Sequence, residues 1–222
     1  MKHPKLLTFF AVYFIAILLT SNVVSTKLVS LWGLTFDGGT LLFPLSYIIG
    51  DILTEVYGYA KARSVIWMWV ATQLVLSLVI IGIGLLPADP SRWLQDSYMN
   101  ILGLTPRIVI ASIIAYLVWE FINSYILAKL KIWTNGSKLW TRTIGSTLIG
   151  QAVDTLIFIM IAFYGIFDAP ILIAIIISNY ILKVSIEVIF TPVTYWVVNR
   201  VKHYEGIDHY DTNTDFNPIK FD

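Results

Sequence analysis

The sequence predicts an all-α polytopic membrane protein, because its composition is too apolar for a chain that folds in water. Of the 222 residues, 57% are hydrophobic and only 13% are charged, and the mean hydropathy is +0.76. A soluble domain carries about 25% charged residues and about 45–50% apolar ones. The net charge of +1 provides no basic surface for nucleic acid, and a chain without cysteine has no disulfides or thiolate metal sites.

Six segments are apolar and long enough to be membrane-spanning helices, which need about 20 residues each. We expect them at residues 6–31, 41–59, 64–86, 107–130, 143–167 and 170–198, followed by a polar, disordered cytoplasmic tail at 203–222. The first segment follows two lysines, as a signal peptide would, but its apolar run continues without a cleavage site, so we interpret it as a retained helix. Between the third and fourth segments, Asp89-Pro90 predicts the start of a short helix on the membrane surface.

The placement of lysine and arginine predicts the orientation of these helices. If the N-terminus is cytoplasmic, the cytoplasmic segments hold eleven of these residues, and the outer segments hold only Arg92 and Arg107. Cytoplasmic loops of membrane proteins carry such an excess of positive charge. The sequence therefore predicts six spans with both termini in the cytoplasm.

Seven charged residues lie within the predicted spans, where lipid disfavours them. A charge at the bilayer centre costs about 2.5–3.5 kcal/mol on the insertion scale. Five of the seven are acids and two are lysines, so three negative charges need protons, a cation or a donor-rich ligand. We expect all seven to face one another or a cavity: Lys27, Asp51, Glu55, Glu120, Asp154, Lys183 and Glu187.

Helical spacing places these charges on polar faces, which indicates a solute site or pathway. One alternative is a static ion pair between Lys183 and Glu187, which are four residues apart. The chain has no motif for ATP hydrolysis, and no acid has the sequence context of an intramembrane aspartyl protease, so transport is favoured. The faces comprise Asp51, Thr54, Glu55 and Gly58; Ser112, Tyr116, Glu120 and Asn123; Thr143, Thr147, Gln151 and Asp154; and Asn179, Lys183 and Glu187.

Three separated motifs resemble the signatures of the queuosine precursor transporters, a family also described as vitamin-uptake-like (VUT) membrane proteins. They are residues 39–58 (GTLLFPLSYIIGDILTEVYG), residues 145–158 (GSTLIGQAVDTLIF) and residues 179–184 (NYILKV), in that order. The resemblance covers about residues 10–202 and includes Ser21-Asn22 in the first span. Some members of the family have glutamine where this chain has Glu120.

The resemblance implies a prokaryotic importer of 7-deazaguanines, in the cell (inner) membrane, that salvages precursors of queuosine in transfer RNA. Its substrates would be 7-cyano-7-deazaguanine, 7-aminomethyl-7-deazaguanine or queuine. The implied fold is similar to the six-helix substrate-binding subunits of energy-coupling-factor vitamin transporters, but without an ATPase partner or a cofactor. Small-residue faces would permit a homodimer.

A guanine-like edge suggests roles for the candidate site residues, because its N–H groups need acceptors and its O6 needs a donor. We expect Asp154 or Glu55 to accept from the edge, and Gln151, Asn179 or Lys183 to donate to O6. Asp51 would pair with Lys27 or Lys183, or share a proton with Glu55. The remaining candidates are Glu120, the polar Asn22, and four aromatic residues placed to stack on the ring, Tyr47, Tyr57, Trp119 and Phe158.

Three functions stay open at this point: a transporter that acts alone, a binding subunit that needs a separate ATPase, and an intramembrane enzyme or assembly factor. The first could also carry another purine-like or vitamin-like solute. The preferred deazaguanine and the choice between proton coupling, sodium coupling and facilitated diffusion are equally open.

Overall fold

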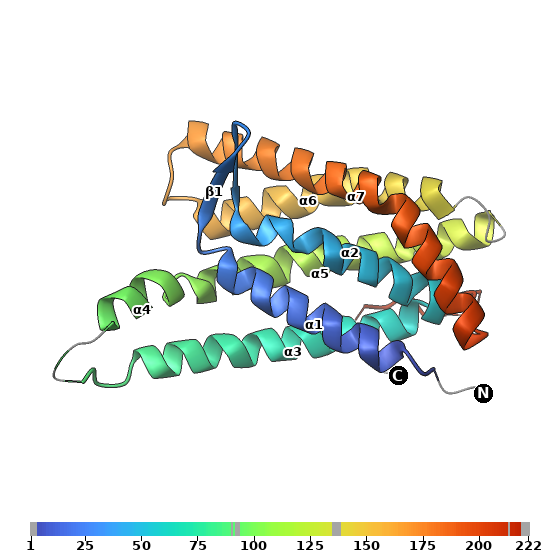
Figure 1. Cartoon of the computed structure of the whole chain (residues 1–222), viewed down its shortest axis with the longest axis horizontal. Helices are drawn as coiled ribbons and strands as arrows, with labels where there is room; N and C mark the ends of the chain where they lie inside the picture. The colour runs from blue at the N-terminus through green and yellow to red at the C-terminus, as the bar shows by residue number, and fades with distance from the viewer. Residues whose placement is uncertain (1–3, 90, 92–93, 135–138, 213, 219–222) are drawn as a thin grey trace.

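Long apolar helices make up most of the chain in the computed structural model (Figure 1). The structure describes residues 4–89, 91, 94–134, 139–212 and 214–218, without the side chains of residues 139–143, 146 and 147. In chain order the elements are α1 (Leu7–Val24), β1 (Leu28–Leu31), β2 (Leu34–Asp37), a 3-10 turn η1 (Gly38–Leu41), α2 (Phe43–Ile52), a π-turn η2 (Leu53–Tyr57), α3 (Tyr59–Gly84), α4 (Gln95–Leu102), α5 (Thr105–Trp133), α6 (Leu139–Phe163) and α7 (Ala169–Glu205).

Proline and glycine mark several helix boundaries. Pro44, Pro106 and Pro170 lie in the first turns of α2, α5 and α7, where a missing N–H group costs nothing. Gly58 has a φ of +86° and separates η2 from α3, while Gly206, with a φ of +64°, ends α7.

The length and apolar composition of the helices indicate a membrane protein. Within the described residues, four stretches are long and apolar enough to cross a bilayer: α1, α3, Gln95–Trp133 and α7. Their outer faces carry large apolar side chains, for example Leu78 and Ile189, which are 68% and 69% exposed. Water would disfavour such a surface, whereas lipid tails favour it.

A β-hairpin replaces the end of the first predicted span. Helix α1 ends at Val24 instead of residue 31, and β1 pairs antiparallel with β2. Trp32 and Gly33 form the two-residue turn, and both have positive φ angles of 53° and 78°, as a tight hairpin turn requires. The prediction that Lys27 lies within a helix is therefore wrong.

The surface helix and the tail also differ from the predictions. Helix α4 begins at Gln95, and Asp89 does not cap it, because Asp89 accepts hydrogen bonds from the backbone and hydroxyl of Ser91 at 2.9 and 2.6 Å. Pro90 lies outside the described residues. In place of a disordered tail from residue 203, α7 continues to Glu205, and Asp211 and residues 214–218 lie against α3, where the Trp67 indole donates to the Pro218 carbonyl at 2.8 Å.

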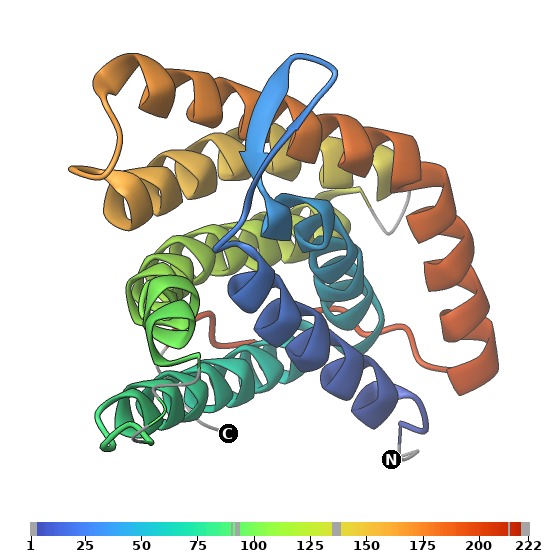
Figure 2. The same cartoon turned by 60° about the vertical axis from the view of Figure 1, so that its left-hand side comes forward.

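The two ends of the bundle are structurally distinct (Figures 1 and 2). The hairpin end carries β1, β2, α4 and the connection between α6 and α7. The tail end carries the start of α1, the end of α7 and residues 206–218. Helix α7 bends toward the tail end in its C-terminal part, which contains the internal Pro192. The candidate site lies between these two ends.

Candidate functional site

Asp154 of α6 and Lys183 of α7 form a buried ion pair inside the bundle. The Asp154 Oδ2 and Lys183 Nζ atoms are 2.8 Å apart, and the side chains are only 6% and 2% exposed. The Tyr47 hydroxyl of α2 donates to the same Asp154 oxygen at 3.2 Å, and Gln151 donates to Glu187 at 3.2 Å. These five residues are the central cluster. The alternative of a static pair between Lys183 and Glu187 is not found among the described residues, because Lys183 bonds across the helix interface to Asp154.

Aromatic rings enclose the central cluster. The ring centroids of Tyr47 and Trp119 are 4.2 Å apart, and Tyr116 stacks at 6.2 Å from Tyr47 with a 15° angle between the planes. The Lys183 ammonium lies 4.8 Å from the centroid of Phe43 and 5.9 Å from that of Phe158, within the range of cation–π attraction. Three of the four aromatic candidates, Tyr47, Trp119 and Phe158, thus lie together, on α2, α5 and α6.

Two buried polar atoms beside these rings, and one further carboxylate oxygen, have no hydrogen-bond partner among the described residues. Both bonds of Asp154 use Oδ2, which leaves Oδ1 without a donor. Gln151 Oε1 lacks a donor, and the Trp119 indole N–H lacks an acceptor. An unsatisfied buried polar group costs about 1–3 kcal/mol, so such groups are usually bonded. Two free acceptors and one free donor therefore indicate a place for a ligand with the complementary pattern.

Gly150 explains why the Trp119 indole can lie at this position. A Cβ atom on Gly150 would be only 2.4 Å from Trp119 Nε1, closer than any side chain allows. Helix α6 therefore lets the ring of α5 approach its backbone one residue before Gln151.

A second polar group, the hairpin-end cluster, joins the hairpin to α1 and α7. Asp37, the last residue of β2, is 1% exposed and accepts from the Ser25 hydroxyl at 2.7 Å. Thr40 and Asn179 complete the cluster, at 2.8 and 3.3 Å from Asp37 Oδ2. Asn179 therefore bonds to the hairpin and is not part of the central cluster. Asp37 was not predicted as a site residue, although the Asp-Gly-Gly-Thr sequence shortly before α2 is a signal of a polar turn.

Asp51 and Glu120 lie between α2 and α5, where both accept hydrogen bonds from α5 side chains. Asn123 donates its amide to Asp51 at 3.1 Å, while Tyr116 and Ser124 donate hydroxyls to Glu120 at 2.9 and 3.2 Å. The expected pairing of Asp51 with Lys27 or Lys183 is not found among the described contacts.

Glu55 and Tyr57 belong to the tail end instead of the central cluster. The Glu55 carboxylate lies 2.8 Å from Lys202 and 3.6 Å from Lys131, and both lysines also contact Asp208, at 3.0 and 2.7 Å. These four residues are the tail-end network. Burial alone would raise the pKa of Asp208, but hydrogen bonds and positive charge from Lys131 and Lys202 hold the pKa below its usual value. Tyr57 donates to Glu205 at 3.1 Å.

Asn22 and the surface of α7 lie outside these three polar groups. Asn22 is fully buried, and neither of its amide atoms has a partner among the described residues. No group of three or more histidine, aspartate or glutamate side chains in the described part of the chain is placed to hold a metal ion.

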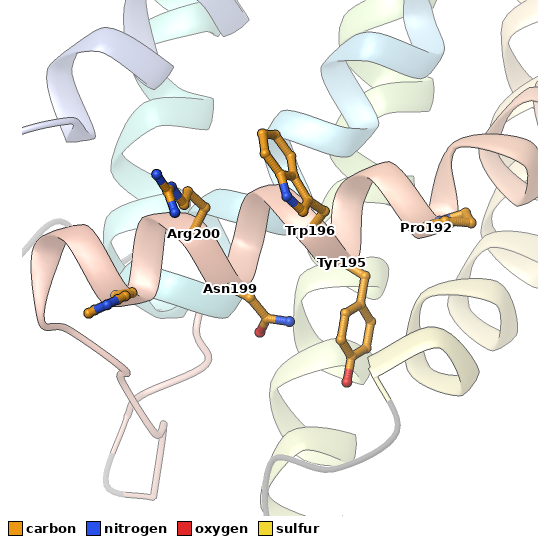
Figure 3. A pocket seen from close by; sticks show the side chains of 6 residues that line it. Pro192, Tyr195, Trp196, Asn199 and Arg200 are labelled. Atoms are coloured by element: carbon orange, nitrogen blue, oxygen red, sulfur yellow. The ribbon is translucent and has the colours of Figure 1, made fainter.

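A surface cavity of about 400 Å³ runs along the bent part of α7, where Trp196 and Arg200 point to one side and Tyr195 and Asn199 to the other (Figure 3). Aromatic and basic residues of this kind anchor helices at the membrane interface.

Comparison with known proteins identifies relatives along most of the chain. Residues 37–197 match a family described as "putative vitamin uptake transporter". The "probable queuosine precursor transporter" of Bacillus subtilis (strain 168) is 32% identical over 79% of this chain and 77% of its own length. The "queuosine precursor transporter" of Escherichia coli (strain K12) is 25% identical over 89% of this chain and 88% of its own. No solved structure matches.

The family match begins at Asp37 of the hairpin-end cluster and includes the whole central cluster. The relatives are named as transporters and not as enzymes, which agrees with the absence of hydrolase motifs in the sequence. The chain therefore belongs to the vitamin uptake (VUT) transporter family.

Proposed function

We propose that this protein imports queuosine precursors, which are 7-deazaguanines, through the central cluster. The observation that carries the proposal is the set of free atoms at Asp154 Oδ1, Gln151 Oε1 and Trp119 Nε1 beside the Tyr47 ring. The names of the two relatives, which cover most of this chain, support the same substrate class.

The edge of a 7-deazaguanine has the pattern that these free atoms require. Its N1–H and exocyclic amine are donors for Asp154 and Gln151, and its O6 is an acceptor for the Trp119 indole N–H. Tyr47 and Phe158 then provide faces for the flat ring, worth about 1–3 kcal/mol for each stacked base. The proposed hydrogen bonds do not involve the 7-substituent, so the cyano, aminomethyl and queuine forms all fit the site. The acids of the central cluster favour the cationic aminomethyl form.

The proposed topology has six spans, with the tail end in the cytoplasm of a prokaryotic cell and the hairpin end outside. Besides the four long apolar stretches, the α2–η2 segment and α6 are the remaining spans, and α6 presents exposed apolar side chains such as Ile149 and Leu156 to lipid. This arrangement is similar to the substrate-binding subunits of energy-coupling-factor transporters. We further propose that the chain acts without an ATPase, as a monomer or homodimer in the cell (inner) membrane.

Transport by the purified protein in liposomes tests this function. We expect uptake of labelled 7-cyano-7-deazaguanine without any added partner or ATP, and competition by 7-aminomethyl-7-deazaguanine and queuine but not by a panel of vitamins. Asp154→Asn should weaken binding at least about tenfold, because a hydrogen bond to a charged group is worth about 1.5–3 kcal/mol. Asp168→Asn, the same change at the residue preceding α7, is the matched control and should bind normally.

Two results would contradict the proposal. Binding that is equal in wild type and Asp154→Asn would exclude the central cluster as the site. Binding without uptake, restored only by an ATPase module, would make the chain a binding subunit.

A further inference from the structure

The hairpin-end cluster has fewer protons than its short contacts require. Thr40 Oγ1 lies 2.8 Å from Asp37 Oδ2 and 2.6 Å from Asn179 Oδ1. A hydroxyl group has one proton and can satisfy only one of these two acceptors. If Asp37 is ionised, two oxygen atoms with no proton between them therefore lie within hydrogen-bonding distance.

Reversing the Asn179 amide does not remove the mismatch. With the amide in its present orientation, Nδ2 donates to Asp37 Oδ2 at 3.3 Å. If the nitrogen and oxygen exchange places, the amide donates to Thr40, but its oxygen then faces the Asp37 carboxylate at that same distance. Either orientation leaves one pair of acceptors facing each other without a proton.

The groups around Asp37 offer no other compensation. Ser25, the residue after α1, has one hydroxyl proton for two acceptors, Asp37 Oδ1 at 2.7 Å and the Ser21 carbonyl at 2.9 Å, and the described residues form no ion pair with Asp37. The nearby titratable groups are Lys27, whose backbone carbonyl bonds to Gly38 in the hairpin, and Lys183, one turn along α7 from Asn179, whose ammonium is bonded to Asp154. Asp37 is also 1% exposed, so its carboxyl group relies on these protein groups for its hydrogen bonds.

We propose that Asp37 is a proton-binding site and that import is coupled to protons. This inference rests on the proposed function. The proton on Asp37 Oδ2 donates to Thr40, and the Thr40 hydroxyl then donates to Asn179, which closes the hairpin onto α7. When the proton leaves, the Thr40 hydroxyl can donate either to the carboxylate or to the Asn179 carbonyl, so the other pair of oxygen atoms repels and the hairpin separates from α7. One proton bound from outside thus closes the hairpin end over a substrate molecule and is released to the cytoplasm when the tail end opens.

Proteoliposomes with a pH gradient test the coupling. The uptake of uncharged 7-cyano-7-deazaguanine is measured with the inside alkaline by one pH unit and the membrane potential clamped by potassium and valinomycin. One proton for each substrate molecule predicts accumulation of about tenfold per pH unit. Exchange of labelled for unlabelled substrate without a gradient is measured in parallel, because exchange requires transport but no net proton movement.

Asp37→Asn is the decisive variant, because the amide N–H group replaces the acid proton toward Thr40. We expect this variant to exchange substrate at near the wild-type rate and to lose gradient-driven accumulation. Asp89→Asn, the same change at an exposed outer residue, should retain both activities. If Asp37→Asn does not fold, Thr40→Val provides the test, because removing the hydroxyl removes the shortage of protons around Asp37. We expect Thr40→Val to reduce accumulation at least threefold without abolishing exchange.

The possible results separate the two proposals. Wild-type exchange without a response to the pH gradient, or accumulation driven by sodium, would overturn the proton site and leave the transport function. Accumulation retained by Asp37→Asn or Thr40→Val would overturn it as well. The absence of both uptake and exchange in wild type would overturn the proposed function itself.

Discussion

At the scale of single residues, Gly150 controls the geometry of the proposed substrate site. Gly150→Ala would place a methyl group 2.4 Å from the Trp119 indole nitrogen, so the ring must move away from the free acceptors. Inserting such a group into a packed interior costs about 1–3 kcal/mol, and we expect the affinity for 7-cyano-7-deazaguanine to fall about tenfold or more. Titration of the purified variant with the ligand measures the effect.

Gly145→Ala in the same helix is the control for this prediction. A Cβ atom at Gly145 meets no atom within 4 Å, and alanine stabilises a helix by about 0.5–1 kcal/mol relative to glycine. We therefore expect normal binding and a slightly higher melting temperature. Equal affinities in the two variants would show that the position of the Trp119 ring does not matter for recognition.

Several residues of the site were predictable from the sequence, because charged and polar side chains within a span are disfavoured in lipid and must face the interior. Asp154, Lys183 and Gln151 lie on polar faces at helical spacing, and the structure buries all three. Their partners were not predictable, because helical periodicity gives the face of a residue and not the helix that packs against it. Asp37 was missed since it lies outside the predicted spans and contacts Asn179 across 142 positions of sequence.

At the scale of elements, the helices followed from apolar length, but the hairpin did not. Residues 28–36 continue the apolar composition of α1, and composition alone does not distinguish the end of a helix from a strand. Only the Trp32-Gly33 turn signals the change, through backbone angles that the hairpin imposes. The tail was expected to be disordered because of its polar composition, whereas in the structure its carbonyl groups accept hydrogen bonds from the buried Arg63 at 2.7 and 3.0 Å.

The hairpin should act as the outer gate, and a chain without cysteine allows this to be tested by cross-linking. The Thr35 backbone N–H of β2 lies 3.4 Å from the Ser178 hydroxyl of α7. We expect a disulfide between Thr35→Cys and Ser178→Cys to hold the hairpin on α7 and to reduce substrate uptake to background. Reduction with dithiothreitol should restore uptake, which is measured in the same vesicles before and after treatment.

A cross-link within the hairpin is the control. Ser30 and Thr35 are directly paired across the two strands, with their hydroxyl oxygens 3.2 Å apart. A disulfide between cysteines at these positions leaves the hairpin free to move as a unit, so uptake should continue. Full uptake with the Thr35–Ser178 disulfide formed would exclude movement of the hairpin relative to α7 during transport.

At the scale of the whole molecule, both ends of the bundle are closed over the central cluster. The hairpin is bonded to α7 at one end, and at the other Lys131 bonds to Asp208 at 2.7 Å and to the His209 carbonyl at 2.6 Å. Between the ends, Asp154 is bonded to Lys183 and Tyr47, and Gln151 is bonded to Glu187. Import requires each end to open in turn, so the contacts at both ends must be separable while the helices remain packed.

The tail-end network should therefore open at low pH, with Asp208 as the group that titrates. Its pKa is lowered from 3.8 in the folded protein, so its contribution to stability is fully present above the unfolded value of about 3.9 and is lost as the pH falls through the lower folded value. A spin label on Thr212→Cys, which is exposed, reports whether residues 206–218 are held in place. We expect the label to be immobile between about pH 5 and 8 and to become mobile below about pH 4.

Asp208→Asn should release the tail at neutral pH, because Lys131 and Lys202 lose a shared carboxylate and keep only Glu55 as an acidic partner among the described residues. The same spin label should then be mobile at pH 7, and its mobility should depend less on acid. Asp96→Asn, on the exposed face of α4 at the opposite end, is the control and should leave the signal unchanged. If the label stays immobile in Asp208→Asn at pH 7, other contacts hold the tail, and the tail-end network does not form the cytoplasmic gate.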